Sequence, residues 1–244
     1  MIDTHCHIDA EEFAADRSEL LQCQQAEGVQ AMIVPGVSLA SVQTVMAVCA
    51  QYPSFCYPAL GLHPEEIKAD WQQQMAEIEA HIRHYASQLV AVGEIGLDYH
   101  WDVEPREVQK EWFIRQIGLA RKYNLPINVH SRDAAEDTFL IIKEHAQGLK
   151  GIIHCFSGSK ELAVEYVKLG FHIGIGGVVT FKNGKKLKEI AGSIPLERIL
   201  LETDCPYLAP EPYRGKRNAS MYLSYVAEEI AKIRGISYEE VVAQ

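Results

Sequence analysis

Short apolar runs alternate with longer amphipathic segments along the whole chain. Eight runs have the length and composition of buried β-strands; they lie around Ile2 and at Ala31–Val34, Cys56–Leu60, Leu89–Val92, Pro126–Val129, Gly151–Ile153, Phe171–Ile175 and Ile199–Leu201. Helical periodicity marks several of the segments between them, which include Phe13–Glu27, Gln72–Ala86, Arg106–Tyr123, Ala134–Ala146 and Glu161–Leu169. Strands that alternate with helices predict βαβ units and a parallel sheet.

The spacing of the strand ends predicts how many such units there are. The residues that close the eight runs are His7, Gly36, His63, Glu94, His130, His154, Gly176 and Asp204. Their separations range from 22 residues (154 to 176) to 36 residues (94 to 130), close to the roughly 30 residues of a βαβ unit. Eight units predict a single (β/α)8 TIM barrel. The competing doubly wound sheet lacks support because no GxGxxG follows the first strand. No linker or composition shift divides residues 1–244, so we expect one domain.

Composition narrows the class of protein. With 244 residues, 48% hydrophobic and 23% charged, the chain is not disordered and can bury a sizeable core. Its formal charge of −10 excludes a global basic surface for DNA or anionic membranes. Six cysteines without a CxxC indicate reduced thiols. The uncharged stretch from Gly28 to Pro64 is broken by Pro35 and Pro53, and the start of the chain does not resemble a signal peptide. We therefore expect a cytoplasmic protein that does not enter a membrane.

Five strand ends carry side chains that can bind a metal: His7, Glu94, His130, His154 and Asp204. In an (β/α)8 barrel the active site lies at the carboxyl ends of the strands, so this coincidence has a structural cause. His5 is two residues before His7, and the period-two alternation of a strand points both rings to one face.

Each of these residues also has a simpler interpretation when it is taken alone. An HxH pair arises by chance, Glu94 would form a salt bridge with an Arg, His130 and His154 would be hydrogen-bonded core histidines, and Asp204 would be a helix N-cap. All of those interpretations would have to hold at once at corresponding ends of different strands.

Four imidazoles and two carboxylates suit two divalent ions that share Glu94 as a bridging ligand. Two such ions contribute +4 and the two carboxylates −2, which leaves +2, or +1 once a hydroxide bridges the ions. A chain of charge −10 would thus present a locally cationic pocket to an anionic substrate.

Seven motifs, in order from residue 1 to the C-terminal part, resemble the TatD family of metal-dependent hydrolases. They are Asp3-Thr-His-Cys-His, Gly61-Leu-His-Pro, Gly93-Glu-Ile-Gly-Leu-Asp-Tyr, His130-Ser-Arg, His154-Cys-Phe-Ser-Gly, Glu202-Thr-Asp-Cys-Pro-Tyr-Leu and Arg214-Gly-Lys-Arg-Asn. The resemblance implies a TIM barrel of the amidohydrolase type, a two-metal centre and DNase activity, with 3′→5′ exonuclease action in some members. It places His5 and His7 on the first metal, Glu94 on the bridge, His130 and His154 on the second metal, and Asp204 as the last-strand aspartate.

Two positions depart from the family pattern. The family often has Glu-Pro after Arg217-Asn218, where this chain has Ala219-Ser220, so the following helix is expected to start differently. The chain also ends earlier than members whose terminal helix continues, which we interpret as a truncated C-terminal helix.

Other residues near the strand ends are candidates for binding substrate. His63 is expected either to bind a phosphate oxygen or to make a structural hydrogen bond, and Arg132 and Ser157 lie where substrate groups would pass. Glu202 shares the inward face of Asp204 and is expected to support the metal ligands. Cys6, between the two histidines, is expected in the core. The basic clusters Lys182–Lys188 and Arg214–Arg217 follow strands seven and eight and are expected to hold backbone phosphates, with a solvated surface as the alternative.

The predicted reaction is hydrolysis of a phosphodiester by metal-activated water, with Asp204 as general base and single-stranded nucleic acid ends as substrate. The alternatives are an ester or amide hydrolase on the same site, such as a deacylase acting on aminoacyl-tRNA, and another phosphoesterase fold that opens with HxH. A non-catalytic metal-binding module is a third. The ligand set favours Zn or Mn over Mg by softness, whereas family members are often assayed with Mg. DNA or RNA as substrate and the oligomeric state stay open, and a monomer is compatible with the sequence.

Overall fold

The computed structural model describes residues 1–101 and 105–243. Its eight strands form one sheet in the order β1-β2-β3-β4-β5-β6-β7-β8, and every pair with a described register is parallel. The chain comprises two compact units. Unit 1 contains Met1–Val34, Cys155–Lys168 and His172–Gln244, and unit 2 contains Pro35–His154 and Leu169–Phe171.

Unit 1 carries the strands at both ends of the chain. Its strands are β1 (Ile2–Asp3), β2 (Ala31–Pro35, which ends at the unit boundary), β7 (His172–Ile175) and β8 (Ile199–Leu201). Its α-helices are α1 (Arg17–Ala26), α6 (Lys160–Lys168), α7 (Lys185–Ser193), α8 (Leu223–Arg234) and α9 (Tyr238–Val242), with 3-10 turns at Glu11–Phe13, Gly177–Thr180, Leu196–Arg198 and Ser220–Tyr222. Backbone bonds such as Thr4 N–H to the Leu201 carbonyl (3.1 Å) join the first strand to the last.

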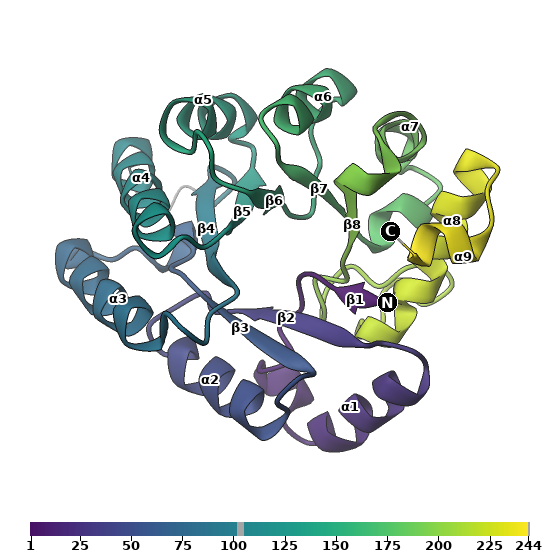
Figure 1. Ribbon diagram of the computed structural model, residues 1–244, viewed down its shortest axis with the longest axis horizontal. Helices are drawn as coiled ribbons and strands as arrows, with labels where there is room; N and C mark the ends of the chain where they lie inside the picture. The colour runs from purple at the N-terminus through teal and green to yellow at the C-terminus, as the bar shows by residue number, and fades with distance from the viewer. Residues whose placement is uncertain (102–104, 244) are drawn as a thin grey trace. The chain divides into compact units, whose positions relative to one another are not determined.

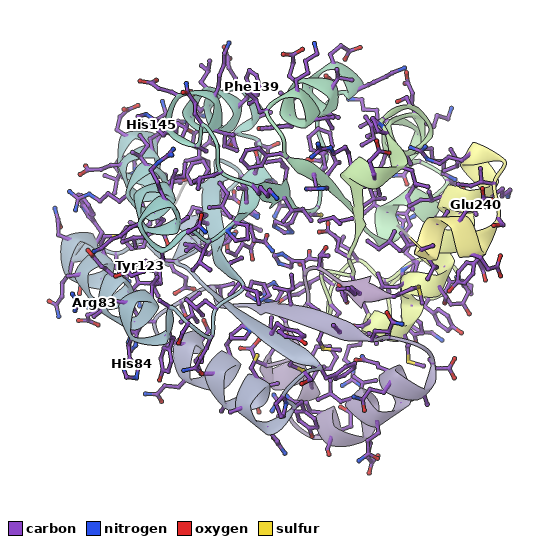
Figure 2. All side chains as sticks on the ribbon, viewed as in Figure 1. Arg83, His84, Tyr123, Phe139, His145 and Glu240 are labelled. Atoms are coloured by element: carbon purple, nitrogen blue, oxygen red, sulfur yellow. The ribbon has the colours of Figure 1, made fainter. Side chains whose placement is uncertain are left out.

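Unit 2 holds the four central strands. They are β3 (Cys56–Leu60), β4 (Ala91–Asp98), β5 (Ile127–Arg132) and β6 (Gly151–Ile153). The helices are α2 (Ser41–Gln51), α3 (Trp71–Tyr85), α4 (Arg106–Tyr123) and α5 (Ala135–His145), with a 3-10 turn at Pro64–Glu66. Helices α3, α4 and α5 cover one face of these strands (Figure 1). Exposed histidines such as His84 of α3 lie on the outer side of this helical layer (Figure 2).

The predicted alternation of eight strands with helices is confirmed, but several element bounds differ. The prediction that His5 and His7 lie on the first strand is wrong, because β1 ends at Asp3, and His130 lies within β5 and not at its end. The two largest differences concern the first helix and β4.

The predicted Phe13–Glu27 helix is divided: a 3-10 turn ends at Phe13 and α1 begins only at Arg17. The Arg17 guanidinium donates to the carbonyls of Ile8, Asp9 and Ala10 at 2.7–3.0 Å, so it is committed to the loop that precedes the helix.

The second difference concerns β4, which extends to Asp98 although the sequence predicts a strand that stops at Val92. Glu94 therefore lies within the strand and not at its end. The pairing of β4 with β5 shifts between Val92 and Ile95, which is a β-bulge. A bulge redirects a side chain without ending the ladder, and a Cβ at Gly93 would approach the Cβ of Asn128 to 2.6 Å. The bulge therefore requires glycine beside Glu94.

Among the described residues, no helix combines the length and the apolar composition that crossing a membrane requires.

Candidate functional site

The residues predicted at the strand ends gather into one cluster in each unit. In unit 1 the Nε2 atoms of His5 and His7 lie 3.1 Å apart. Asp204 Oδ1 lies 3.7 Å from the first and 3.6 Å from the second. We call His5, His7 and Asp204 the unit 1 triad. The His5 ring is buried, whereas the side chain of Asp204 is 17% exposed.

Backbone contacts after β1 and β8 position the unit 1 triad. Asp204 has a left-handed φ of 57°, and its N–H donates to the His5 carbonyl at 2.9 Å. The Asn218 amide donates to the carbonyls of Thr203 (2.8 Å) and Tyr207 (2.7 Å), on either side of Asp204. The Arg214–Asn218 motif thus supplies a clamp for the loop that carries the aspartate.

A buried carboxylate supports the same triad and was not assigned by the sequence. Asp3 accepts hydrogen bonds from the N–H of His5 (3.2 Å) and of Thr203 (3.0 Å), and from the Thr203 hydroxyl (2.5 Å). Complete burial raises the pKa of Asp3 against the effect of these donors. Its position two residues before His5, in the Asp3-Thr-His-Cys-His motif, is the signal that would have identified it.

In unit 2 the carboxylate of Glu94 is at the centre of a second cluster. Glu94 Oε1 lies 2.7 Å from His154 Nε2 and 3.1 Å from His130 Nδ1, and these two ring nitrogens are 3.3 Å apart. We call Glu94, His130 and His154 the unit 2 triad. His63 Nε2 approaches the same oxygen to 3.6 Å, and its Nδ1 accepts from the N–H of Glu65. The side chain of Glu94 is only 4% exposed.

Asp98 is the residue of unit 2 that sequence reasoning missed. Its Oδ2 lies 2.9 Å from His130 Nε2, the ring nitrogen that faces away from Glu94. Burial opposes ionisation of Asp98, but the hydrogen bonds from His130 and from the His100 N–H lower its pKa to about 2. A carboxylate that holds the far nitrogen of a ligating histidine is common in metal sites. The signal was its spacing of four from Glu94 along a strand.

The pKa values of His130 and His63, which both lie near Glu94, are shifted in opposite directions. Burial alone would lower the pKa of His130, but its bonds to Asp98 and Glu94 raise it to about 9. Burial and the positive charge of His130 lower the pKa of His63 to about 3. His63 is therefore a neutral imidazole at pH 7, and because its Nδ1 accepts from Glu65, its Nε2–H can donate one hydrogen bond.

One face of α4 fixes the backbone on which these unit 2 residues stand. The Gln109 side chain makes two bonds of 2.9 Å with the N–H and carbonyl of Asp98. Gln116 does the same for Leu62, at 2.8 Å and 3.0 Å, and Trp112 Nε1 donates to the Leu62 carbonyl at 2.9 Å. These three buried side chains, spaced at three and four residues, lie on one helix face and hold the chain next to His63 and at Asp98.

The remaining predicted residues occupy different environments. Glu202 is buried, and its Oε1 accepts from the Cys155 N–H at 2.5 Å. Glu202 and Ser157 line a cavity of about 300 Å³ in unit 1 that also reaches Asp204. Arg132, at the end of β5, lies over the ring of the exposed Trp101 at 5.5 Å. Cys6 is fully buried, as predicted for a core residue.

Some cations of the two basic clusters line the cavity, and others form ion pairs. Lys185 and Lys186, in the first turn of α7, line the cavity beside Asp204. Lys188, in the same helix, pairs with Glu229 of α8 at 2.6 Å. Arg217 pairs with Asp16 at 2.5 Å. Of the predicted phosphate-binding cations, Lys185 and Lys186 line the cavity, whereas Arg214 lies over the Phe181 ring at 4.3 Å.

Comparison with known proteins places this site in a family context. The family profile described as TatD related DNase matches residues 2–244. A metal-dependent hydrolase of Bacillus subtilis, YabD, is 44% identical over 244 residues, which cover 100% of this chain and 94% of the relative. The human deoxyribonuclease TATDN3 is 33% identical over 252 residues, 99% of this chain and 90% of the relative.

Solved structures agree with the sequence comparison. The crystal structure of YJJV, a TatD homologue from Escherichia coli, superposes with a TM-score of 0.91 at 32% identity, and covers 99% of this chain and 93% of that chain. With the parallel eight-strand order, this likeness confirms the predicted (β/α)8 barrel fold class.

Proposed function

This chain belongs to the TatD-related DNase family and is a metal-dependent hydrolase of that type, and we propose that it hydrolyses phosphodiester bonds at the ends of single-stranded nucleic acid. The observation that carries the proposal is the pair of triads, each with three nitrogen and oxygen donors turned toward one another. A human relative is named a deoxyribonuclease, which supports a nucleic acid substrate. We also propose that the protein acts in the cytoplasm.

The donor sets fit divalent ions. Three ligand atoms at about 2.0–2.1 Å from one ion and at tetrahedral angles lie about 3.3–3.4 Å from one another. The separations are 3.1, 3.6 and 3.7 Å in the unit 1 triad and 2.7, 3.1 and 3.3 Å in the unit 2 triad. We therefore propose that each triad holds one divalent ion, and the bridging role of Glu94 stays a prediction. Imidazole-rich sets favour Zn or Mn, and the carboxylates also admit Mg.

The side chains of this protein divide the chemical work. When bound, the ions would lower the pKa of a water molecule and offset negative charge on the phosphate. Asp204 has a partly exposed carboxylate on a clamped loop, and it would accept the proton of the attacking water as general base. The bond from the water oxygen to phosphorus would form, the ester P–O bond would break, and the departing ester oxygen would take up a proton from solvent to become a hydroxyl. His63, neutral at pH 7, is suited to donate a hydrogen bond to a phosphate oxygen.

A substrate screen tests this function. The metal-depleted protein is reconstituted separately with Zn, Mn, Co and Mg, and assayed with single-stranded DNA, RNA, aminoacyl-tRNA and methyl p-nitrophenyl phosphate. We expect cleavage of at least one nucleic acid and of the small diester under the same metal. Cleavage of aminoacyl-tRNA alone would replace phosphodiester hydrolysis by deacylation. Inactivity on every substrate, with both ions present by elemental analysis, would favour a non-catalytic metal-binding module.

A further inference from the structure

We propose that the exposed ring of Trp101 in unit 2 stacks against a nucleobase of the substrate strand while Arg132 binds the adjoining phosphate. This inference rests on the proposed phosphodiesterase function and adds a residue that recognises the base. Trp101 is 53% exposed, although burial of so large an aromatic ring would contribute strongly to folding. The fold leaves this ring outside the core, where a ligand can reach it.

Trp101 is connected to the unit 2 triad through its neighbours in the chain. The His100 ring meets the Trp101 ring edge-on, with centroids 4.8 Å apart and planes at 88°. Asp133 fixes the His100 ring through a 3.0 Å contact with Nδ1. The His100 N–H donates to Asp98 Oδ1 at 2.8 Å, and Asp98 Oδ2 lies 2.9 Å from His130 Nε2. The segment that carries Trp101 is therefore held by the same carboxylate that supports a proposed metal ligand.

Arg132 brings a positive charge to the same place. The side chain is exposed, and its guanidinium carbon lies 5.5 Å from the centre of the Trp101 ring. Arg132 follows His130 by two residues within β5, so the two side chains leave the strand on one face. A guanidinium can bind a phosphate through two parallel hydrogen bonds. A phosphate bound by Arg132 would therefore lie on the side of β5 that carries the triad histidine.

A second tryptophan–arginine pair in unit 2 has different surroundings. Arg115 of α4 lies over the ring of Trp71 of α3 at 5.2 Å, but Glu111 neutralises its charge at 2.6 Å. That pair joins two helices, whereas Trp101 follows the carboxyl end of β4 and Arg132 ends β5, the side of a barrel on which active sites lie. Trp71 is therefore a matched control for Trp101.

The chemistry of Trp101 and Arg132 selects the ligand. Every nucleobase has a π face that stacks on an aromatic ring, so the contact tolerates any base. The planar guanidinium matches the geometry of a phosphate. Bases of a duplex already stack on their neighbours, and withdrawing one costs free energy, so an unpaired base is favoured. The pair thus fits a single-stranded nucleotide unit, with its base on Trp101 and its phosphate on Arg132.

Equilibrium binding tests the stacking site separately from catalysis. Fluorescence anisotropy compares a labelled phosphorothioate oligothymidylate, which resists hydrolysis, with the same backbone carrying abasic tetrahydrofuran units. We expect the wild type to bind the thymidine strand at least about fivefold more tightly, the lower limit for one stacked base. Trp101→Ala should abolish this ratio, Trp101→Phe should retain most of it, and Trp71→Ala should leave it unchanged. Equal affinity of the wild type for both strands, or equal losses in the two alanine variants, would overturn the stacking site.

Tryptophan emission gives a readout that a merely structural role would not change. A base stacked on an indole ring quenches its fluorescence, so the thymidine strand should quench emission from the wild type and from Trp71→Phe. Trp101→Phe should lose the quenching although it still binds the strand. Quenching that persists in Trp101→Phe would remove Trp101 from contact with the base.

The contribution of Arg132 is measured through salt. Arg132→Gln should weaken binding of the thymidine and abasic strands alike and lower the log–log salt slope by about 0.7 units for each lost phosphate contact. Trp101→Ala should keep the wild-type slope. An unchanged slope in Arg132→Gln would remove Arg132 from the phosphate contacts.

Hydrolysis of methyl p-nitrophenyl phosphate by the wild type, loaded in turn with Zn, Mn, Co and Mg, is measured in parallel. Base-dependent binding without this hydrolysis would overturn the proposed phosphodiesterase function and leave Trp101 as a nucleic acid contact. Hydrolysis without base-dependent binding would overturn the stacking site alone.

Discussion

The unit 1 and unit 2 triads contain the same donor types in different surroundings. Each has two imidazoles and one carboxylate, but Asp204 is 17% exposed and stands 3.6–3.7 Å from its histidines, whereas Glu94 is 4% exposed and lies as close as 2.7 Å to His154. The difference in exposure supports the proposal that the two carboxylates have different roles. A carboxylate enclosed by imidazoles is suited to hold an ion, and one that reaches solvent can exchange a proton with water.

The supporting contacts follow the same division. In unit 2, Asp98 holds a ligand side chain directly, and α4 holds the backbone of Asp98 through Gln109. In unit 1 the support acts on the main chain, since Asp3 and Asn218 bind backbone groups around His5 and Asp204. The unit 2 histidine ring is thus fixed through its far nitrogen, whereas the unit 1 support holds the backbone that carries Asp204.

The largest expected effect comes from Glu94→Gln. An amide is a weaker ligand than a carboxylate, so the unit 2 triad should lose its ion and hydrolytic activity should fall almost to background. Elemental analysis of the purified variant measures the ions per chain. If Glu94 bridges, both sites should be depleted. If only one ion is lost, Glu94 serves unit 2 alone, and full occupancy would remove it from the metal ligands.

Asp204→Asn should separate catalysis from metal binding. An amide cannot accept the proton, so in protein reloaded with both ions kcat should fall by about 10²–10⁴-fold, with KM nearly unchanged. Kinetics and metal content are measured on the same sample. A metal-replete variant with near-normal kcat would show that Asp204 is not the base and would erase the functional contrast between the triads.

Asp98→Asn should give a smaller loss that appears first in affinity for metal. Removing the charge behind His130 makes the ring a weaker ligand, and loss of such partners costs about 10–100-fold in metal affinity or activity. Competition with a chromogenic chelator measures the affinity. Asp133→Asn is the matched control, because Asp133 pairs with the exposed His100 and not with a triad member. Equal effects of the two variants would mean that Asp98 acts only on the fold.

Lys185→Ala combined with Lys186→Ala should have the smallest effect. The double variant should raise KM for an oligonucleotide a few-fold and reduce the salt dependence, by about 0.7 units of log–log slope for each lost contact with a single strand. Lys182→Ala, in the same exposed segment but outside the cavity lining, controls for net charge.

Lys188→Ala is a further control for that experiment. The sequence places Lys188 in the same basic cluster as Lys185 and Lys186, but in the structure it pairs with Glu229. Lys188→Ala should lower the free energy of unfolding by about 0–1 kcal/mol, as surface ion pairs do, without a change in KM. A raised KM would indicate that Lys188 contacts the substrate.

Much of the fold could be predicted because it depends on local periodicity. The alternation of apolar runs with amphipathic segments anticipated α4 at Arg106–Tyr123 to the residue. The same pattern wrongly placed Glu94 at the end of the fourth strand. The bulge in β4 depends on pairing with β5, and Gly93 is its only mark in the sequence. The single-domain organisation stays a prediction, and the functional roles of the site residues are predictions that the experiments above test.

The sequence by itself determined the alternation of strands and helices and the ligand types at the strand ends. The sequence predicted that His5 and His7 lie close together because they share a strand face, but β1 ends at Asp3, and the two rings meet on the segment that follows the strand. Tertiary structure alone decided the contact of Asp98 with His130, which depends on the parallel register that pairs Gly96 with His130. It also decided which lysines line the cavity and which one pairs with α8. Such contacts join residues tens of positions apart, and local periodicity carries no information about them.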